Sequence, residues 1–311
     1  MNRADKGTNI DFMGKRRIAM GLSLVLVIGS LAMLFARGLN FGIDFTGGTL
    51  IEVAYPKAAE LDGIRNVLED AGFGDVQVQH FGTARDVLIR IAPREGEAGA
   101  KLSEDVMTAL RHADTGVEQR RVEFVGPQVG GELTEQGGLA VLYSLIGILI
   151  YVTLRFEYRL SLGAVAALVH DVAITLGVFS LLQVEFDLTV LAAVLAVIGY
   201  SLNDTIVVFD RIRENFRRMR KGEPVDIMNA SINQTLSRTL MTSGTTMLVL
   251  IALFAFGGEI IHGFALALIV GVFVGTYSSI FVAGALSLAL GVSKTDLMSM
   301  EKEGRNLDTS P

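Results

Sequence analysis

The sequence predicts an α-helical polytopic membrane protein with six transmembrane helices and one α+β domain inserted between the first and second helices. Half of the 311 residues are hydrophobic, only 19 % are charged, and the mean hydropathy is +0.47. The apolar residues gather in long uninterrupted runs, whereas a soluble domain of this length spreads them periodically. One stretch, residues 37–136, departs from this pattern and alternates between apolar and polar positions.

Six runs are long enough to cross the hydrocarbon core of a bilayer, which takes about 20 apolar residues. None of these runs contains a proline, so the sequence does not predict a broken transporter helix. The last run is long and is expected to tilt or to continue as an interfacial helix. The predicted spans are residues 18–36, 137–154, 162–182, 188–209, 239–258 and 263–290.

Lysine and arginine residues alternate between the two sides of these spans. The N-terminus, residues 1–17, carries five, segment 210–238 carries seven, and the tail 291–311 carries three. The two short loops on the opposite side, 183–187 and 259–262, carry none. The positive-inside rule therefore places both termini and the basic segment in the cytoplasm. The first span is expected to be an uncleaved signal anchor, because its apolar run exceeds the core of a typical signal peptide.

Segment 37–136, on the outer side of the membrane, has a secondary structure of its own. Alternating stretches in it predict strands and amphipathic stretches predict helices. Their order is β-α-β-β-α-β, which suggests a split-βαβ, ferredoxin-like sandwich. Its 17 acidic and 10 basic residues are interpreted as a solvated domain surface. The predicted strands are residues 49–55, 75–81, 86–91 and 117–124, and the predicted helices are 59–71 and 101–112.

The composition argues against an enzyme. Without cysteine there is no thiolate metal site, and the four histidines lack HExxH or HxxxH spacing. The sequence also lacks a P-loop and a dinucleotide fingerprint. We therefore expect no enzymatic active site, no metal or cofactor, and no nucleic acid partner. Residues 297–311 are polar and without periodicity, which predicts a disordered tail.

Asp204 is the most informative residue, because it is the only formal charge in the run from residue 188 to 209. Insertion scales put about 3 kcal/mol against an aspartate near the middle of a membrane helix, and such a residue usually faces a water path, a partner side chain or a transported ion. Ser201 and Asn203 lie within one turn and are expected to share a polar surface with Asp204. Asn203 is interpreted as a contact that holds helices together.

Arg238 is a candidate partner for this acid, because it opens the fifth predicted span at a compatible depth. Thr242, Thr245 and Thr246 are spaced so that they continue a polar stripe from Arg238 into the membrane. The alternative interpretation is that Arg238 is a snorkelling anchor at the boundary of the span.

His170 and Asp171 place a second ionisable pair near the middle of the third predicted span. Adjacent residues of a helix point about 100° apart, so these two are expected to face different neighbours. Together with Asp204 and Arg238 at a similar depth, the pair suggests a proton relay more than a binding site for a solute.

The last predicted span carries two weaker features. Gly271 and Gly275 form a G-x-x-x-G pattern, which permits two helices to pack closely. The hydroxyl-bearing residues 276–279 that follow are compatible with a wet cavity and equally with hydrogen bonds between helices.

Several segments resemble the SecF members of the SecD–SecF family, within the resistance-nodulation-division superfamily. The resemblance covers nearly the whole chain and follows the order of the spans. The SecD members typically open their outer domain with DLQGG and have a larger outer domain, so the resemblance is to SecF. The matching segments are DFTGG at 44–48, VGPQVG at 125–130, GYSLND at 199–204 and RIREN at 211–215.

The resemblance implies a SecD partner, with which the chain would form a pseudosymmetric bundle of twelve spans in the inner membrane. It further implies a periplasmic outer domain, the use of proton motive force to promote preprotein translocation, and cooperation with the SecYEG channel, with YajC and YidC as additional partners. The membrane aspartate and arginine of the family match Asp204 and Arg238, which the resemblance makes the proton-pathway pair. His170 and Asp171 also match the family pattern.

Two other functions stay open at this point. A proton-driven exporter of small solutes is one, because the same superfamily contains such exporters; six spans would then require a partner or a homodimer. A purely structural membrane subunit is the other, in which Asp204 is only a packing residue.

Overall fold

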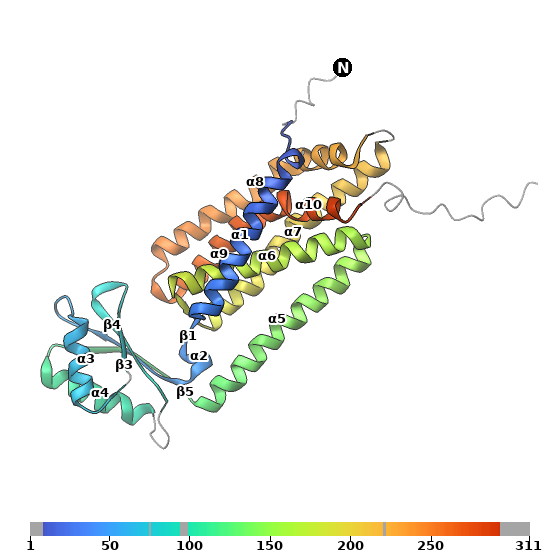
Figure 1. The fold of residues 1–311 in the computed structure, drawn as a ribbon. Helices are drawn as coiled ribbons and strands as arrows, with labels where there is room; N and C mark the ends of the chain where they lie inside the picture. Colours follow the sequence, from blue (N-terminus) through green and yellow to red (C-terminus); the bar gives the residue numbers. More distant parts are fainter. Residues whose placement is uncertain (1–8, 75, 94–98, 220–221, 293–311) are drawn as a thin grey trace, which may run out of the picture.

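The structure is a computed structural model that describes residues 9–74, 76–93, 99–219 and 222–292. A long helical bundle carries a small domain with a sheet at one end (Figure 1). The chain runs through the first long helix, forms the small domain, and returns into the bundle (Figure 1). The predicted disordered tail, 297–311, lies outside the described residues.

Within the described ranges, six helical segments are long and apolar enough to cross a membrane, and each corresponds to one predicted span; the predicted spans 239–258 and 263–290 end one or two residues beyond their helices. Short 3-10 turns, Met13–Lys15 and Glu259–Ile261, precede the first and the last of these segments. The helices of the bundle are α1 (Arg16–Arg37), α5 (Pro127–Arg155), α6 (Tyr158–Leu182), α7 (Leu188–Arg218), α8 (Pro224–Phe256), α9 (His262–Phe281) and α10 (Ala283–Ala289).

Several helices differ in extent from the predicted spans. Helix α5 begins at Pro127 and not at residue 137, and α8 begins at Pro224 and not at residue 239. Helix α7 continues past residue 209 to Arg218, so most of the predicted basic segment is helical. The last predicted span, 263–290, is divided, because α9 ends at Phe281 and the short α10 follows it.

The extensions of α7 and α8 hold each other in place. Asn215 on α7 donates hydrogen bonds to Ser231 at 2.9 Å and to Gln234 at 3.0 Å on α8. Phe216 and Met228 are buried in the same apolar cluster beside these bonds. Amphipathic turns of this kind form helix without being uniformly apolar, which is why hydropathy alone ends the spans too early.

Helices α6, α7 and α9 form the centre of the bundle. In the most apolar 18-residue stretch of each of these segments, half of the residues are buried. In the corresponding stretches of α1, α5 and α8, only 6 to 17 % are buried. Close packing at the centre depends on glycine: a Cβ at Gly271 would lie 2.1 Å from a methyl carbon of Val197 on α7, and one at Gly275 would lie 3.1 Å from Cβ of Ser201. The predicted close packing at the G-x-x-x-G pattern is therefore confirmed.

The small domain contains a four-stranded antiparallel sheet with two helices. The sheet has the strand order β3-β4-β2-β5, and its elements follow the chain in the predicted β-α-β-β-α-β order. Alternate strand residues, such as Ile51 and Ile89, pack with Leu68 and Val106 of the helices in one core cluster. The elements are β2 (Gly48–Ala54), α3 (Leu61–Asp70), β3 (Val76–Phe81), β4 (Thr83–Ile91), α4 (Gly99–Ala113) and β5 (Glu118–Val125).

A second, two-stranded sheet joins the small domain to the bundle. Strand β1 (Asn40–Phe41) pairs in parallel with β6 (Glu185–Phe186), which lies between α6 and α7. The short helix α2 (Ile43–Thr46) follows β1 and leads the chain into β2. Arg90 on β4 forms an ion pair with Glu185 and donates a hydrogen bond to the carbonyl of Phe41 at 3.0 Å. The sequence did not predict this junction.

Candidate functional site

Asp204 lies buried in the middle of the bundle, on α7. Its carboxylate accepts a hydrogen bond from the hydroxyl of Ser243 on α8, at 3.3 Å. Ser243 in turn accepts a hydrogen bond from Thr276 on α9, at 2.7 Å. The acid is thus connected to two neighbouring helices by hydroxyl groups.

Asp171 on α6 is completely buried and forms a second polar cluster. One of its oxygens accepts hydrogen bonds from Ser201 on α7, at 2.5 Å, and from Ser278 on α9, at 2.7 Å. The other oxygen lies 2.8 Å from Nδ1 of His170. This carboxylate therefore ties together the three central helices of the bundle.

The contact between His170 and Asp171 corrects the expectation that the two residues face different neighbours. The angle of about 100° separates the Cα–Cβ directions of adjacent residues, and rotation of the side chains still lets their polar atoms meet. The imidazole also stacks against the ring of Tyr277, with centroids 6.2 Å apart. Tyr277 donates a hydrogen bond to the carbonyl of Ala19 at 2.8 Å, so the cluster reaches α1.

Nε2 of His170 is buried and has no hydrogen-bond partner among the described residues. A buried polar atom without a partner costs free energy unless a water molecule or an ion satisfies it. Nε2 is therefore the atom of the Asp171 cluster that is left without a hydrogen-bond partner among the described residues. An imidazole nitrogen of this kind can bind or release a proton.

The two clusters lie side by side and are separate. Ser201 and Asp204 are three residues apart on α7, and Thr276 and Ser278 are two residues apart on α9. No hydrogen bond between described residues connects the Asp171 cluster with the Asp204 cluster. A proton that passes from one to the other needs water or a movement of side chains.

Arg238 on α8 is exposed and makes no direct ion pair with Asp204 within the described part of the chain. It is near enough to act on the negative charge of Asp204 through space. Its guanidinium lines a cavity of about 440 Å³ together with Asp210, Arg211 and Glu214. Arg238 thus lies near the middle of α8 and borders this cavity.

The polar stripe predicted on α8 does not face Asp204. Thr242 is exposed, and its hydroxyl bonds the carbonyls of Arg238 and Thr239 in its own helix. Thr246 is half-buried and lies 3.5 Å from the hydroxyl of Tyr200. The helix turns the neighbouring residue, Ser243, toward Asp204 instead. Hydrophobic packing sets the rotation of α8 about its axis. Because hydroxyl residues occupy adjacent positions, the sequence does not show which of them faces Asp204.

Asn203 is placed away from Asp204 as well, because its side chain is exposed on the outside of α7. Ser201 was expected to share a polar surface with Asp204; it is buried and bonds Asp171 instead. The hydroxyl groups of Thr276, Tyr277 and Ser278 bond neighbouring helices, which favours the interpretation of hydrogen bonds between helices, whereas Ser279 donates to the carbonyl of Thr276 in its own helix. Among the described residues, no group of three or more metal-ligating side chains comes together.

Comparison with known proteins identifies the family. The C-terminal family described as protein export membrane protein SecD/SecF matches residues 105–293, and the SecD/SecF GG motif matches residues 32–58. The chain belongs to the SecD/SecF family. Protein translocase subunit SecF of Vibrio alginolyticus is 60 % identical over 306 residues, which cover 97 % of each chain. The subunit SecF of Pseudomonas aeruginosa is 53 % identical over 93 % of this chain and 94 % of its own. The predicted resemblance to SecF is confirmed.

A solved structure extends this similarity to the fold. The crystal structure of SecDF, a translocon-associated membrane protein from Thermus thermophilus, matches with a TM-score of 0.83 and 40 % identity. The match covers 93 % of this chain, which spans 39 % of the length of that SecDF chain. A structure of SecDF in a super-membrane-facing form matches the same share of this chain with a TM-score of 0.68.

The matched segments contain the site and both strands of the junction, whereas Arg90 lies between the two segments. The aspartates, Arg238 and the hydroxyl groups that bond the acids all fall within residues 105–293. The GG motif contains Gly47 and Gly48, which have φ angles of 71° and 129°. A Cβ on Gly48 would lie 2.6 Å from the carbonyl oxygen of Ile91, and one on Gly47 would lie 2.9 Å from Cα of Pro127. Glycine is therefore required where the chain leaves α2 and enters the sheet.

Proposed function

We propose that this chain is an accessory subunit of the Sec protein translocase. With a SecD-type partner, it uses proton motive force to promote preprotein translocation and release on the periplasmic side. Curated relatives that cover almost the whole chain are named protein translocase subunit SecF. The SecDF chain is much longer than this one and is described as translocon-associated. Both findings support a role as one part of a larger translocation machine.

The observation that carries the proton-coupling role is the setting of Asp204. A carboxylate buried at the centre of a membrane bundle is expensive and needs a compensating function. Here its hydrogen-bonding neighbour is Ser243, a neutral hydroxyl and not a fixed cation. A hydroxyl can donate to the ionised acid and accept from the protonated acid by rotating. Asp204 can therefore take up and release a proton without a large rearrangement.

Arg238 and the second cluster complete the proposed pathway. Arg238 would return Asp204 to its ionised form, because a nearby cation favours the charged carboxylate. Its position beside the open cavity would give the released proton access to the cytoplasm. His170 and Asp171 would carry protons or hold the helices in register, with the unpartnered Nε2 as the point of exchange. No enzymatic step is part of this proposal.

The exposed face of α7 supports a membrane partner. Asn203 is exposed and makes no hydrogen bond within the described residues, and its neighbours on the exposed face of the helix, Ala192, Ala196 and Gly199, carry no polar side chain. An amide facing lipid would leave its polar atoms unsatisfied, and helices in membranes commonly pair such groups with one another. We assign this face to the SecD partner, and we extend the partnership to the SecYEG channel, with YajC and YidC as further components.

The location follows from the same proposal. The multi-pass bundle would lie in the inner membrane with both termini in the cytoplasm, because the basic residues gather at one end. The small domain would then be periplasmic. Its strand order β3-β4-β2-β5 supports the ferredoxin-like sandwich.

Substitution of one buried and one exposed aspartate tests this function. Inverted inner-membrane vesicles that carry Asp204→Asn should translocate a preprotein no faster with a proton gradient than with a protonophore. Asp226→Asn is the matched control, because it removes an exposed aspartate from the first turn of α8. It should retain the full response to the gradient. A normal gradient response of a stably assembled Asp204→Asn chain would overturn the proposal. Altered drug accumulation with normal secretion would favour an exporter instead.

A further inference from the structure

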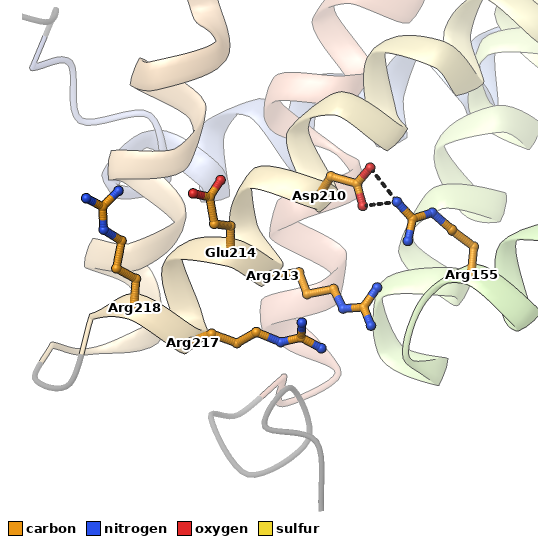
Figure 2. Close-up of a pocket in the computed structure, with 6 residues that line it drawn as sticks. All are labelled: Arg155, Asp210, Arg213, Glu214, Arg217 and Arg218. Atoms are coloured by element: carbon orange, nitrogen blue, oxygen red, sulfur yellow. Dashed lines mark hydrogen bonds and ion pairs between the residues drawn. The ribbon is translucent and has the colours of Figure 1, made fainter.

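A second charged site lies at the basic end of the bundle, away from the buried acids. It is a pocket of about 410 Å³ between the end of α5 and the last turns of α7 (Figure 2). Four arginines and two acidic residues line it, which leaves an excess of positive charge. The lining residues are Arg155, Asp210, Arg213, Glu214, Arg217 and Arg218.

The acidic residues of this pocket are already paired. Arg155 donates to both oxygens of Asp210, at 2.8 and 2.9 Å. Glu214 forms an ion pair with Arg211, at 2.6 Å, outside the pocket. Arg213 makes no hydrogen bond or ion pair within the described part of the chain. Its positive charge is therefore available for a ligand.

The arrangement of the side chains favours an anion with several oxygens. Arg213 and Arg217 extend from α7 toward the side where Arg155 stands, whereas Arg218 points the other way (Figure 2). Guanidinium groups are planar, remain charged at any physiological pH, and bind phosphate oxygens in pairs. Arg213 and Arg217, which line the same pocket and extend to the same side, are therefore suited to bind one phosphate group together.

The position of the pocket indicates where such a phosphate comes from. Arg155 is the last residue of α5, and the turn before it presents apolar side chains to the outside. Leu154 is 84 % exposed, Ile150 is 55 % exposed, and Tyr158, at the start of α6, is 65 % exposed. Exposed apolar residues followed by an aromatic residue and arginines are typical of the boundary between acyl chains and headgroups.

We infer that this pocket binds the phosphate of an anionic phospholipid of the inner leaflet, with the acyl chains along α5. Basic pockets between membrane helices on the cytoplasmic side are suited to acidic headgroups. A nucleic acid or an acidic protein could also bind the positive charge of the pocket. Neither of them would cover the adjoining apolar surface of α5, as the acyl chains of a lipid do. This inference does not depend on the proton pathway.

Native mass spectrometry of the full chain in detergent tests the site. Phosphatidylglycerol should be retained in preference to phosphatidylethanolamine. Because one arginine near an anionic surface is worth about 1 kcal/mol, Arg213→Gln should weaken retention about fivefold. Adding Arg217→Gln should weaken it about 25-fold in total. Arg17→Gln is the matched control: it removes the same charge from an exposed arginine in the first turn of α1, outside this pocket, and it should leave retention unchanged.

Three outcomes would overturn the inference. Equal losses in Arg17→Gln and Arg213→Gln would show that the effect comes from the overall charge of the chain and not from this pocket. Displacement of the lipid by an equal concentration of glycerol 3-phosphate would identify a free phosphate as the ligand. Unchanged retention in the double variant would show that Arg213 and Arg217 do not bind the lipid. If the glutamine variants do not fold, Arg213→Met removes the charge and keeps much of the aliphatic side chain; retention equal to that of the native chain would contradict the phosphate contact.

Discussion

The ion pair between Arg90 and Glu185 should control how firmly the small domain is held against the bundle. Arg90 is 12 % exposed and Glu185 is 26 % exposed, so the pair is largely shielded from water. Burial raises the pKa of Glu185, Arg90 lowers it, and the nearby Asp187, Asp44 and Glu123 raise it, with a net upward result. Arg90 is thus the cation that acts on Glu185 within a group of four carboxylates, of which Glu123 is paired with Arg121.

The sign of the pH dependence follows from this upward shift. A carboxyl group whose pKa is higher in the folded state binds its proton more tightly there than in the unfolded state. The folded junction therefore gains stability as the pH falls through the interval between the ordinary pKa of Glu185 and its raised value. It loses this contribution as the pH rises above that interval.

Arg90→Gln leaves the carboxylate without its cation. Loss of one partner of a fully buried pair costs about 3–5 kcal/mol, and the residual exposure of both groups reduces this to about 1–3 kcal/mol. The junction should open about 5- to 150-fold more often at neutral pH. Glu185→Gln should be nearly neutral, because the amide still accepts a hydrogen bond from Arg90 and the repulsion among the acids is relieved.

Hydrogen exchange reports this opening at the bonds that cross the junction. The amide of Gly42 donates to the carbonyl of Phe186 at 2.9 Å, and the amide of Leu188 donates to Asp44 at 3.0 Å. Their protection should fall in Arg90→Gln at neutral pH and recover on acidification or when Glu185→Gln is added.

Arg65→Gln provides the matched control for this experiment. It breaks an exposed pair with Asp62 in the same domain and should change protection very little. A loss in Arg90→Gln that persists unchanged at low pH would refute the role assigned to Glu185. An equal loss in Arg65→Gln would show that the effect is not specific to the junction.

Three further outcomes are expected from the packing and the polar clusters. Gly177→Ala places a Cβ 2.7 Å from a backbone carbon of α1 and should destabilise the bundle by about 1–3 kcal/mol in detergent melts, while Gly147→Ala, which has open space, should not. Ser278→Ala removes one donor from Asp171 and should cost about 0.6–1.7 kcal/mol in the same melts, with export reduced if the cluster carries protons. Arg238→Ala should lose gradient-driven export and Arg238→Lys should retain part of it; equal losses would indicate that the planar group is needed and not the charge alone.

The features that follow from local pattern were predictable from the sequence. The six apolar runs are long and free of internal charge apart from a few residues, so their existence as membrane helices does not depend on tertiary contacts. The sheet domain alternates strongly enough that each element is found within a few residues of its predicted place. Asp204 stood out for the same reason, as one charge in a uniformly apolar run.

Features that depend on rotation or on distant contacts were not predictable. Thr242 and Ser243 are adjacent, and only the packing of α8 decides which hydroxyl faces Asp204. The junction rests on strands of two residues each, β1 and β6, which are 143 residues or more apart in the sequence and too short to show a pattern. The partner of Glu185, Arg90, comes from a third segment. The chain contains many arginines, and the sequence does not show which of them pairs with Glu185.

Proton flux tests most directly whether Asp204 couples a proton gradient to translocation. The complex of this chain with its SecD-type partner would be reconstituted into liposomes, and proton uptake measured after an imposed gradient, normalised to inserted protein. The native complex and the Asp226→Asn complex should take up protons. The Asp204→Asn complex should show no more proton uptake than empty liposomes. Native uptake in an assembled Asp204→Asn complex would contradict it.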